Sequence, residues 1–291
     1  MMERGILLKG IGSFYEVLTE SGETVTSKAR GSFRREGIVP TVGDRVVIER
    51  KEQGYAQLSE ILPRRNLLVR PPVANVDQLL IVVSASVPAP DWLLVDRLII
   101  SAKRIGIEPV PVLNKIDVAD AAILETFLSD YHAFHTLTVS AETGDGLDAL
   151  NERLRGKVTC FSGQSAVGKS SLLNALIPAL RLETGELSRK TERGRHTTRH
   201  AELWPYENGA VLDTPGFSMF ETECLEQSEL DACYPEFSDA APCRFPGCMH
   251  LSEPDCGVKP LLETGALTKG RYERYREIAL DYQMRRKHRY D

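Results

Sequence analysis

The chain has 291 residues, of which 42% are hydrophobic and 26% charged, and its formal net charge is −5. A chain of this length can bury substantial cores and has room for two or three domains. No apolar stretch approaches the length needed to cross a bilayer, so we expect no membrane partner. The acidic balance argues against a uniformly basic nucleic-acid binder, although the charge is distributed unevenly.

Residues 1–68 are expected to form a small N-terminal β-barrel. Short strand-like runs separated by turns occur at 5–8, 14–17 and 43–48. Strands of this length with glycine punctuation favour an OB-fold. Basic residues surround Phe33 here, namely Lys28, Arg30, Arg34 and Arg35. This mixture of cations and aromatic surface predicts an RNA-binding barrel, although basic loops are common and the indication is weak by itself.

A second domain is expected over residues 73–222, with the pattern of an α/β P-loop domain. The segment 64–72 has two arginines at its start and two prolines at its end, and it predicts a linker. The apolar run 78–83 that follows predicts the first strand of the domain.

The first motif of this domain is Asn114-Lys115-Ile116-Asp117, which follows the strand-like run 109–113. The Asp117 carboxylate can accept hydrogen bonds from both N1–H and the exocyclic amine of guanine. Adenine presents an acceptor where guanine has a donor, so ATP would leave this carboxylate unpaired at a cost of a few kcal/mol. The aliphatic stem of Lys115 can cover a face of the base. Taken alone, Asn-Lys-x-Asp also occurs by chance in surface turns.

A second motif, Ser140-Ala141-Glu142-Thr143-Gly144, follows the apolar run 136–139. A backbone amide near Ser140 and Ala141 can donate a hydrogen bond to the guanine carbonyl. Both motifs stand at the ends of apolar runs, where a parallel sheet presents its ligand-binding loops. Their agreement favours a guanine site over a chance match.

Residues 163–170 match the phosphate-loop pattern Gly-x-x-x-x-Gly-Lys-Ser without a mismatch. They lie between the apolar run 158–161 and a helical pattern, which is the context that this motif requires. Lys169 is expected to span the β- and γ-phosphates, and Ser170 to ligate Mg²⁺. A glycine-rich surface turn is the competing interpretation, which the partner motifs disfavour. The GTP contacts predicted from this region are Gly163, Gln164, Ser165, Ala166, Val167, Gly168, Lys169, Ser170 and Ser171.

Further predicted GTP and Mg²⁺ contacts lie on both sides of the apolar run 210–212. Asp213, at the end of this run, suits a carboxylate that holds Mg²⁺ through a water. The amide of Gly216 can approach the γ-phosphate. Upstream, Thr197 and Thr198 are candidates for the threonine that supplies a second protein ligand to Mg²⁺.

Phe217 follows Gly216, at the position where Ras-like GTPases have the glutamine that positions the attacking water. Intrinsic hydrolysis is therefore expected to be slow or to use another residue. His196 is the candidate catalytic residue, because it titrates near neutral pH and could orient or activate water. The alternative is a solvated loop histidine.

The order of the motifs differs from that of an ordinary GTPase, which begins with the phosphate loop and ends with the base-reading motifs. Here the base-reading motifs come first, the phosphate loop follows, and the Asp213 motif is last. All parts are present but cyclically rotated. This order predicts a circularly permuted GTPase whose core is joined to extra sequence at both ends.

Three cysteines and a histidine lie within fourteen residues among prolines and glycines: Cys243, Cys248, His250 and Cys256. This composition and spacing predict a tetrahedral site for one Zn²⁺ per chain. Four protein ligands leave no open position for catalysis, so we expect a structural metal. Disulfides are the competing explanation, disfavoured by the lack of a signal peptide and the need for an intracellular GTP pool. The remaining cysteines are interpreted as ordinary thiols: Cys160, Cys224 and Cys233.

Residues 223–291 are predicted to form a zinc-binding, helical C-terminal domain. From Lys269 to Asp291, eight Arg and Lys residues stand against four acids, interleaved with tyrosines. The stretch is helix-forming and could meet phosphates along one face. A solvated amphipathic helix is the alternative, and it is favoured when this stretch is considered alone.

With these motifs together, the chain resembles the family of ribosome small-subunit-dependent GTPases known as RsgA. The resemblance covers the barrel, the permuted core, Gly194-Arg195-His196-Thr197-Thr198, Asp213-Thr214-Pro215-Gly216-Phe217, the Cys-His module and the basic tail. In related bacterial ribosome-assembly GTPases, the segment that Thr-Thr-Arg-His resembles is the first switch, which favours Thr198 over Thr197 as the Mg²⁺ ligand.

The resemblance implies a late assembly factor of the small ribosomal subunit. Such a protein would bind the subunit and its rRNA in the GTP state and leave after subunit-stimulated hydrolysis to GDP and phosphate. We therefore expect a cytoplasmic protein, and we expect it to be monomeric.

Two other function classes stay open on the sequence alone. A P-loop ATPase or metabolic kinase shares the phosphate loop but has no need of Asp117, so nucleotide competition separates it from a GTPase. A constitutive RNA-binding protein would use the flanking domains without hydrolysis, and a turnover assay separates that case.

Overall fold

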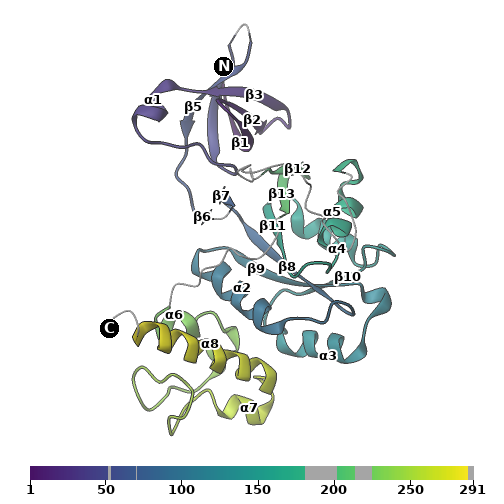
Figure 1. Ribbon diagram of the computed structural model, residues 1–291, viewed down its shortest axis with the longest axis vertical. Helices are drawn as coiled ribbons and strands as arrows, with labels where there is room; N and C mark the ends of the chain where they lie inside the picture. The colour runs from purple at the N-terminus through teal and green to yellow at the C-terminus, as the bar shows by residue number, and fades with distance from the viewer. Residues whose placement is uncertain (52–53, 70, 181–201, 214–224, 288–291) are drawn as a thin grey trace, which may run out of the picture.

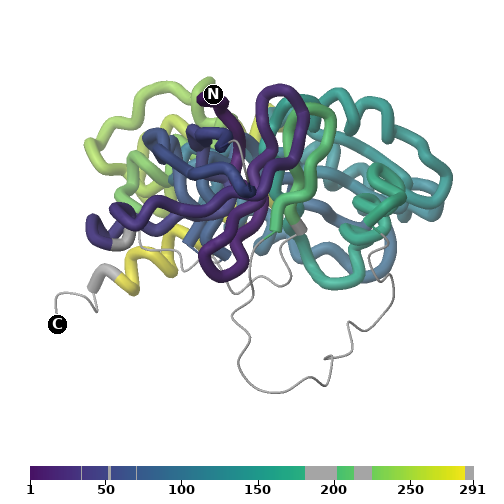
Figure 2. Tube along the Cα trace, turned by 90° about the horizontal axis from the view of Figure 1, so that it is seen from above, coloured from purple at the N-terminus to yellow at the C-terminus, as the bar shows by residue number. Residues whose placement is uncertain are grey.

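The computed structural model describes residues 1–51, 54–69, 71–180, 202–213 and 225–287. Figure 1 shows a barrel at one end of the molecule, a sheet with helices in the middle and a helical module at the other end. Seen from above, the light green and yellow helical module and the teal part of the central domain extend to opposite sides of the barrel (Figure 2). Within the described ranges, no helix is both long enough and apolar enough to span a membrane.

The N-terminal barrel has the strand order β1-β2-β3-β5-β4 and closes by antiparallel pairing of β1 with β4. Its elements are β1 Met2–Ile11, β2 Phe14–Thr19, β3 Thr24–Ala29, α1 Gly31–Arg35, β4 Arg45–Glu49 and β5 Ala56–Ile61. Alternate residues point inward, and Leu7, Val17, Ile48 and Leu58 are fully buried. The predicted N-terminal β-barrel is thus confirmed, and it has five strands.

The expectation that Phe33 contributes an exposed aromatic surface is wrong. Phe33 lies in α1 with only 7% of its surface exposed, and it belongs to the same buried cluster as the barrel interior. Burying a phenylalanine side chain stabilises a fold by about 1.5–3 kcal/mol, which favours a helix orientation that turns this ring inward. The exposed aromatic residues of the barrel lie elsewhere.

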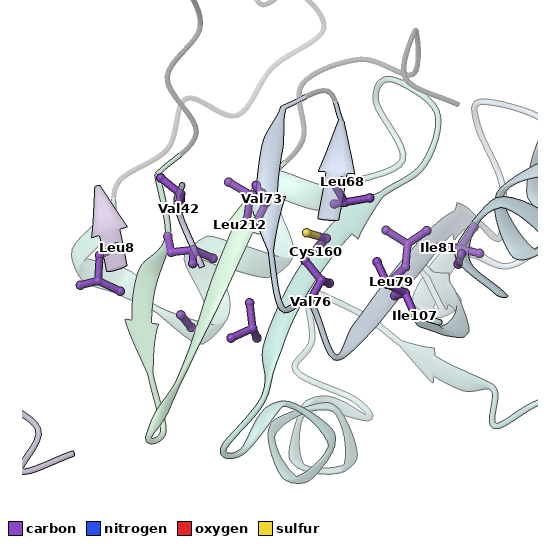
Figure 3. Close-up of a cluster of buried hydrophobic side chains, with 14 of the residues drawn as sticks. Leu8, Val42, Leu68, Val73, Val76, Leu79, Ile81, Ile107, Cys160 and Leu212 are labelled. Carbon is purple, nitrogen blue, oxygen red and sulfur yellow. The ribbon is translucent and has the colours of Figure 1, made fainter. Parts of the chain in front are cut away.

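The predicted linker is structured and joins the barrel to the next domain. It forms a small antiparallel ribbon of β6 Leu67–Val69 and β7 Pro72–Ala74. Before it, the Arg64 guanidinium donates to both carboxylate oxygens of the fully buried Asp44, at 2.6 and 2.9 Å. Figure 3 shows side chains from the barrel, the ribbon and the central sheet meeting in one buried cluster. The barrel is therefore packed onto the central domain.

The central domain is a six-stranded sheet with the order β10-β9-β8-β11-β13-β12. Its strands are β8 Gln78–Ser84, β9 Glu108–Asn114, β10 Leu137–Val139, β11 Val158–Ser162, β12 Trp204–Tyr206 and β13 Gly209–Asp213. Only β12 runs antiparallel to its neighbour. Every residue of β8 is buried, as expected for the apolar centre of a parallel sheet covered on both faces.

Helices pack on both faces of this sheet. They are α2 Trp92–Arg104, α3 Ala121–Asp130, α4 Leu147–Leu154 and α5 Lys169–Leu176, with the short 3₁₀ turns η1 Ile116–Val118 and η2 Pro178–Leu180. One buried cluster, which contains Ile99 and Phe127, includes residues of α2 and α3, and another, which contains Leu150 and Leu172, includes residues of α4 and α5. This arrangement is the predicted α/β domain.

The C-terminal module packs against α2 on the side away from the barrel (Figure 1). It contains α6 Gln227–Asp231, the 3₁₀ turn η3 Pro235–Asp239, α7 Pro260–Thr264 and the long α8 Lys269–Lys287. Its buried cluster includes Tyr234, Tyr275 and Ile278, together with Ile100 from α2. The module therefore shares its core with the central domain.

Candidate nucleotide site and metal centre

The predicted nucleotide motifs meet at the carboxyl ends of the parallel strands. The loops after β9, β10 and β11 carry the Asn114-Lys115, Ser140-Ala141 and Gly163–Ser170 motifs. β8 and β11 lie side by side although they are far apart in the chain. Open α/β sheets bind ligands at such a reversal of strand order.

Two glycines of the phosphate loop are required by close packing. Gly163 has a φ of +143°, and a Cβ there would lie 2.1 Å from the carbonyl oxygen of Val82. Gly168 has a φ of +97°, and a Cβ there would lie 2.3 Å from Nδ2 of Asn114. Larger residues would push the loop away from β8 and from the base-reading motif. The loop leads directly into α5, whose N-terminal amides and dipole favour an anion.

Asn114 connects all three loops. Its side chain is 1% exposed, Nδ2 donates to the carbonyl oxygen of Val167 at 2.9 Å, and Oδ1 accepts from the amide of Ala141 at 3.2 Å. Both the nitrogen and the oxygen of this side-chain amide are therefore hydrogen-bonded within the protein. The structure gives this asparagine a connecting role that its place in the motif alone does not indicate.

Lys115 lies along the junction between the loops. It adopts the left-handed conformation with a φ of +66°. Its Nζ donates to the carbonyl oxygens of Val87 and Ala166, at 2.7 and 2.8 Å. The side chain is thereby fixed beside the phosphate loop.

Asp117 is exposed and held by one hydrogen bond. Its Oδ1 accepts from the hydroxyl of Ser140 at 2.6 Å, and that hydroxyl also accepts from the amides of Glu142 and Thr143, at 3.2 and 3.1 Å. Ser140 itself is fully buried. The carboxylate is thus oriented beside the second motif, as a base-reading acceptor requires.

Lys169 and Gln164 make different contacts within the phosphate loop. Lys169 Nζ donates to the carbonyl oxygens of Gly163 and Gln164, at 2.8 and 2.7 Å, so the ammonium lies across the loop. The Gln164 side chain turns toward α2 instead. Its Oε1 accepts from the amide of Asp91, and its Nε2 donates to the carbonyl oxygen of Ala89, at 3.0 and 3.3 Å.

The remaining members of the predicted site divide into two groups. Ser165 and Ala166 are exposed on the loop, Val167 is buried beneath it, and Ser170 and Ser171 are half-buried in the first turn of α5. Asp213 ends β13 beside Phe161 of β11, one strand from the phosphate loop. The other predicted residues lie outside the described ranges: His196, Thr197, Thr198 and Gly216.

The predicted metal ligands form one cluster in the loop between η3 and α7. The ligand atoms of Cys243, Cys248, His250 and Cys256 all lie within 4.8 Å of one another. Nδ1 of His250 faces the sulfur atoms of Cys243 and Cys256, at 3.5 and 3.3 Å. All of these cysteines are free thiols. The donor set and its convergence fit a tetrahedral zinc site.

Asp231 is a functional candidate that the sequence motifs missed. Its Oδ2 lies 3.2 Å from Nε2 of His250, on the ring edge opposite the cysteines. Gln227 Nε2 and the Tyr275 hydroxyl hold its other oxygen, at 2.7 and 3.2 Å. Burial lowers the pKa of His250, but the hydrogen bonds to Asp231 and Cys256 outweigh this effect, and the pKa rises to about 9. A carboxylate in this position fixes the tautomer and orientation of a ligating histidine.

A buried ionic cluster joins α8 to the central domain. Arg271 is 1% exposed, forms an ion pair with the fully buried Asp96 of α2, and donates through Nε to Glu236 at 3.1 Å. Arg274 donates to Asp96 at 2.6 Å and to Asp130 at 2.9 Å. Burial lowers the pKa of Arg271, but the neighbouring carboxylates outweigh this effect and raise it.

This cluster changes the interpretation of the basic tail. Arg271 and Arg274 face inward, as do Tyr272, Tyr275 and Tyr282, which are at most 8% exposed. These residues cannot meet phosphates along an outer face. The arginines hold the helix against the central domain, and the tyrosines pack it into the buried cluster of the C-terminal module. The amphipathic alternative fits this arrangement, because the aromatic residues follow the helical repeat that faces the core.

Two other cysteines have no ligand role in this arrangement. Cys160 and Cys233 are buried, and burial raises the pKa of Cys160 to about 12 and that of Cys233 to about 11. Such thiols are inert at neutral pH. The interpretation of both as ordinary thiols is confirmed, whereas Cys224 lies outside the described part of the chain.

The sheet order and the loops together define a P-loop GTPase whose base-reading motifs precede the phosphate loop. Comparison with known protein families supports this assignment to the GTPases. The family model of the RsgA GTPase domain matches residues 61–223, and the family model of the RsgA N-terminal domain matches residues 4–57. The chain belongs to the RsgA family and is a GTPase.

Curated relatives match nearly the whole chain. A protein of Geobacillus thermodenitrificans (strain NG80-2), named "Small ribosomal subunit biogenesis GTPase RsgA", is 42% identical over 98% of this chain and 99% of its own length. A protein of Caldanaerobacter subterraneus subsp. tengcongensis with the same name is 42% identical over 99% of both chains.

Solved structures have the same architecture. YjeQ from Thermotoga maritima superposes with a TM-score of 0.83 and 35% identity, covering 97% of this chain and 99% of its own. YloQ, described as a circularly permuted GTPase, has a TM-score of 0.82 and 34% identity, covering 98% of this chain and 96% of its own. The predicted permutation is confirmed.

Proposed function

We propose that this GTPase acts in the late assembly of the small ribosomal subunit. It binds the subunit and its rRNA with GTP bound and leaves after subunit-stimulated hydrolysis to GDP and phosphate. The observation that carries the nucleotide chemistry is the Asn114 side chain, whose two ends join the phosphate loop to the second guanine motif. The assembly role rests on the relatives that share nearly the full length of the chain.

The proposed guanine pocket lies between Lys115 and Asp117. The Asp117 carboxylate accepts from the two guanine donors while Ser140 holds one of its oxygens. The stem of Lys115 covers one face of the base, and an amide at Ala141 donates to the guanine carbonyl. Because these side chains are already held in place, little conformational entropy is lost when the nucleotide binds.

The proposed phosphate and Mg²⁺ contacts lie at the start of α5. The loop amides cradle the phosphates, and Lys169 exchanges its present carbonyl partners for β- and γ-phosphate oxygens. Ser170 and Thr198 ligate Mg²⁺, and Asp213 holds it through a water. His196 orients the attacking water, in place of the glutamine that Ras-like GTPases use.

The proposed metal is one structural Zn²⁺ held by Cys243, Cys248, His250 and Cys256. When bound, it cross-links the loop between η3 and α7. We further propose three functional units, which are residues 1–68, 73–222 and 223–291. Action on ribosomal subunits would place the protein in the cytoplasm, and we propose that it works there as a monomer.

The decisive experiment is GTP turnover by the full chain with small subunits, with large subunits and with neither. Stimulation by small subunits alone is expected. Equal rates in all three assays would refute the proposed partner while leaving the GTPase assignment untouched. Competition between GTP and ATP in the same assay separates the guanine site from that of a P-loop ATPase.

Base recognition has a test of its own. Asp117→Asn should weaken GTP binding and shift preference toward xanthosine nucleotides, because the carbonyl at C2 of xanthine can accept from the new amide. Nucleotide titration measures both affinities. GTP affinity equal to that of the wild type would remove Asp117 from the pocket.

A further inference from the structure

The side chain of Gln164, a residue of the phosphate loop, is bound outside that loop. Its Oε1 accepts from the amide of Asp91 at 3.0 Å, and its Nε2 donates to the carbonyl oxygen of Ala89 at 3.3 Å. Both partners are backbone groups, one a fixed donor and the other a fixed acceptor, so the orientation of the side-chain amide is defined. The two contacts join segments that are 73 and 75 residues apart in the chain.

The connection between β8 and α2 depends on these contacts. It contains Pro88 and Pro90, which have no backbone N–H to donate. Asp91 is the N-cap of α2, and the backbone amides at the start of a helix have no intrahelical acceptor. The Asp91 carboxylate accepts from the amide of Leu94 at 2.9 Å and so fixes the first turn of the helix. The same residue offers its own amide to Gln164.

The helix α2 is itself held firmly on two sides. Leu98 and Ile99 are at most 1% exposed and pack in the same buried cluster as residues of β8. Asp96, little more than one turn after the N-cap, forms buried ion pairs with Arg271 and Arg274 of α8, which lies beside α2 (Figure 1). A helix held in this way moves little relative to the sheet, so a loop that is bound to its start is fixed as well.

The main chain of Gln164 contacts the phosphate-binding lysine. Nζ of Lys169 donates to the carbonyl oxygen of Gln164 at 2.7 Å and to that of Gly163 at 2.8 Å. The residue whose side chain is bound to α2 is therefore also a residue whose carbonyl holds the ammonium. Catalysis by a phosphate loop depends on the placement of its backbone amides and of this lysine. Gln164 thus fixes the position from which Lys169 reaches the phosphates.

We propose that Gln164 is a positioning residue for GTP hydrolysis, which binds the phosphate loop to the start of α2 and thereby aligns Lys169 with the β- and γ-phosphates. The side chain of Gln164 contacts neither the base nor the phosphates, and only its backbone belongs to the phosphate loop proper. Without these two hydrogen bonds the loop still binds nucleotide through its amides, but the ammonium is less well aligned in the transition state. This inference rests on the proposed contact of Lys169 with the phosphates.

The first test is Gln164→Met, which keeps an unbranched side chain of similar length but removes both hydrogen bonds. Single-turnover hydrolysis of radiolabelled GTP by the full chain, at saturation and without ribosomal subunits, should slow by about 10- to 100-fold, the scale of a misplaced catalytic group. The affinities for GDP and GTP should change little, because the loop amides remain. Gln57→Met is the matched control, since Gln57 is a half-buried glutamine of the barrel, and it should match the wild type in both measurements.

A double-mutant cycle tests whether Gln164 acts through the start of α2. Asp91→Ala removes the cap that fixes the first turn of this helix and so loosens the amide that Gln164 binds. It should slow hydrolysis when Gln164 is present and have no further effect in Gln164→Met, because the affected contact is already lost. Additive losses would show that Gln164 acts elsewhere, for example on the attacking water, and would overturn the positioning role.

Two further outcomes would overturn the inference: a wild-type rate in Gln164→Met, or nucleotide affinities that fall as much as the rate, which would indicate a general loss of loop structure. Urea unfolding of each variant verifies its fold. Lys169→Ala in the same assay separates this inference from the proposed function. If Lys169→Ala loses turnover and Gln164→Met keeps it, the positioning role alone fails. If Lys169→Ala keeps turnover, the proposed phosphate contact fails as well.

Discussion

The nucleotide site and the C-terminal module are held together by different forces. In the nucleotide site, short loops contact one another mainly through backbone carbonyls and amides, with Asn114 and Lys115 as connectors. In the C-terminal module, side chains far apart in the sequence form the contacts, as the Arg271 and Asp96 pair shows. Backbone-built sites are encoded in local motifs, whereas ion pairs across domains are not.

The difference has an energetic consequence. The loss of one contact leaves most of the phosphate loop intact, because several backbone amides contribute to anion binding. Losing one partner of a buried ion pair leaves an uncompensated charge, which costs far more than an exposed pair contributes. We therefore expect mutations in the nucleotide site to affect chemistry more than folding, and mutations in the module to do the reverse.

The largest effect is expected from Cys248→Ala, which removes one of four metal ligands. Metal binding is expected to supply much of the folding free energy of the loop between η3 and α7. Metal analysis should find one zinc per wild-type chain and none in the variant. GTP binding should survive, because the phosphate loop lies in the central domain. Cys160→Ala serves as the control, because its thiol is not in the metal cluster. Full zinc content in Cys248→Ala would contradict the ligand assignment.

Lys169→Ala is expected to impair GTP hydrolysis and to leave folding almost unchanged. The ammonium lies across the phosphate loop, so its loss should reduce turnover by about 10²- to 10³-fold or more, the scale of one lost charge-stabilising donor. Urea unfolding should be almost unchanged. Single-turnover kinetics and unfolding curves measure both quantities. A variant that keeps wild-type turnover would remove Lys169 from the chemistry.

Much of the nucleotide site was predictable from the sequence because each motif is short and its geometry is local. A glycine at 163 or 168 indicates a tight turn, and the end of an apolar run indicates the ligand-binding edge of the sheet. The sequence did not show that Gln164 turns toward Asp91, since that contact depends on the position of α2.

The basic tail shows the limit of such predictions. Arg271 and Arg276 have the same charge on the same helix, but one is 1% exposed and the other faces solvent. Which of them is buried depends on the position of Asp96, which is 175 residues away from Arg271 in the sequence. Asp231 was missed for the same reason, because its link to His250 exists only after folding. Phe33 and Phe14 differ likewise, one buried and one exposed.

The two arginines provide a matched pair for the third prediction. Arg271→Ala should destabilise the contact between α8 and the central domain by about 3–5 kcal/mol, because Asp96 and Glu236 stay buried without this partner. Arg276→Ala should cost well under 1 kcal/mol, as is usual for an exposed side chain. Hydrogen exchange of the α8 amides in mild urea measures the difference. Equal protection in both variants would show that the buried cluster does not hold the module in place.

The smallest effect is expected at Asp231, which touches a proposed ligand and not the metal. Asp231→Asn keeps the shape of the side chain but removes the charge that orients Nε2 of His250, so zinc affinity should fall by about 10- to 100-fold. Asp239→Asn is the matched control, because Asp239 is exposed nearby and its side chain bonds only weakly, at 3.5 Å, to Ser238. Competition with a chromophoric chelator measures the affinities. Because all four ligands remain, zinc should still bind stoichiometrically at saturation, which distinguishes an orienting residue from a ligand. Affinities equal in both variants would show that the cysteines and the backbone orient His250 without help.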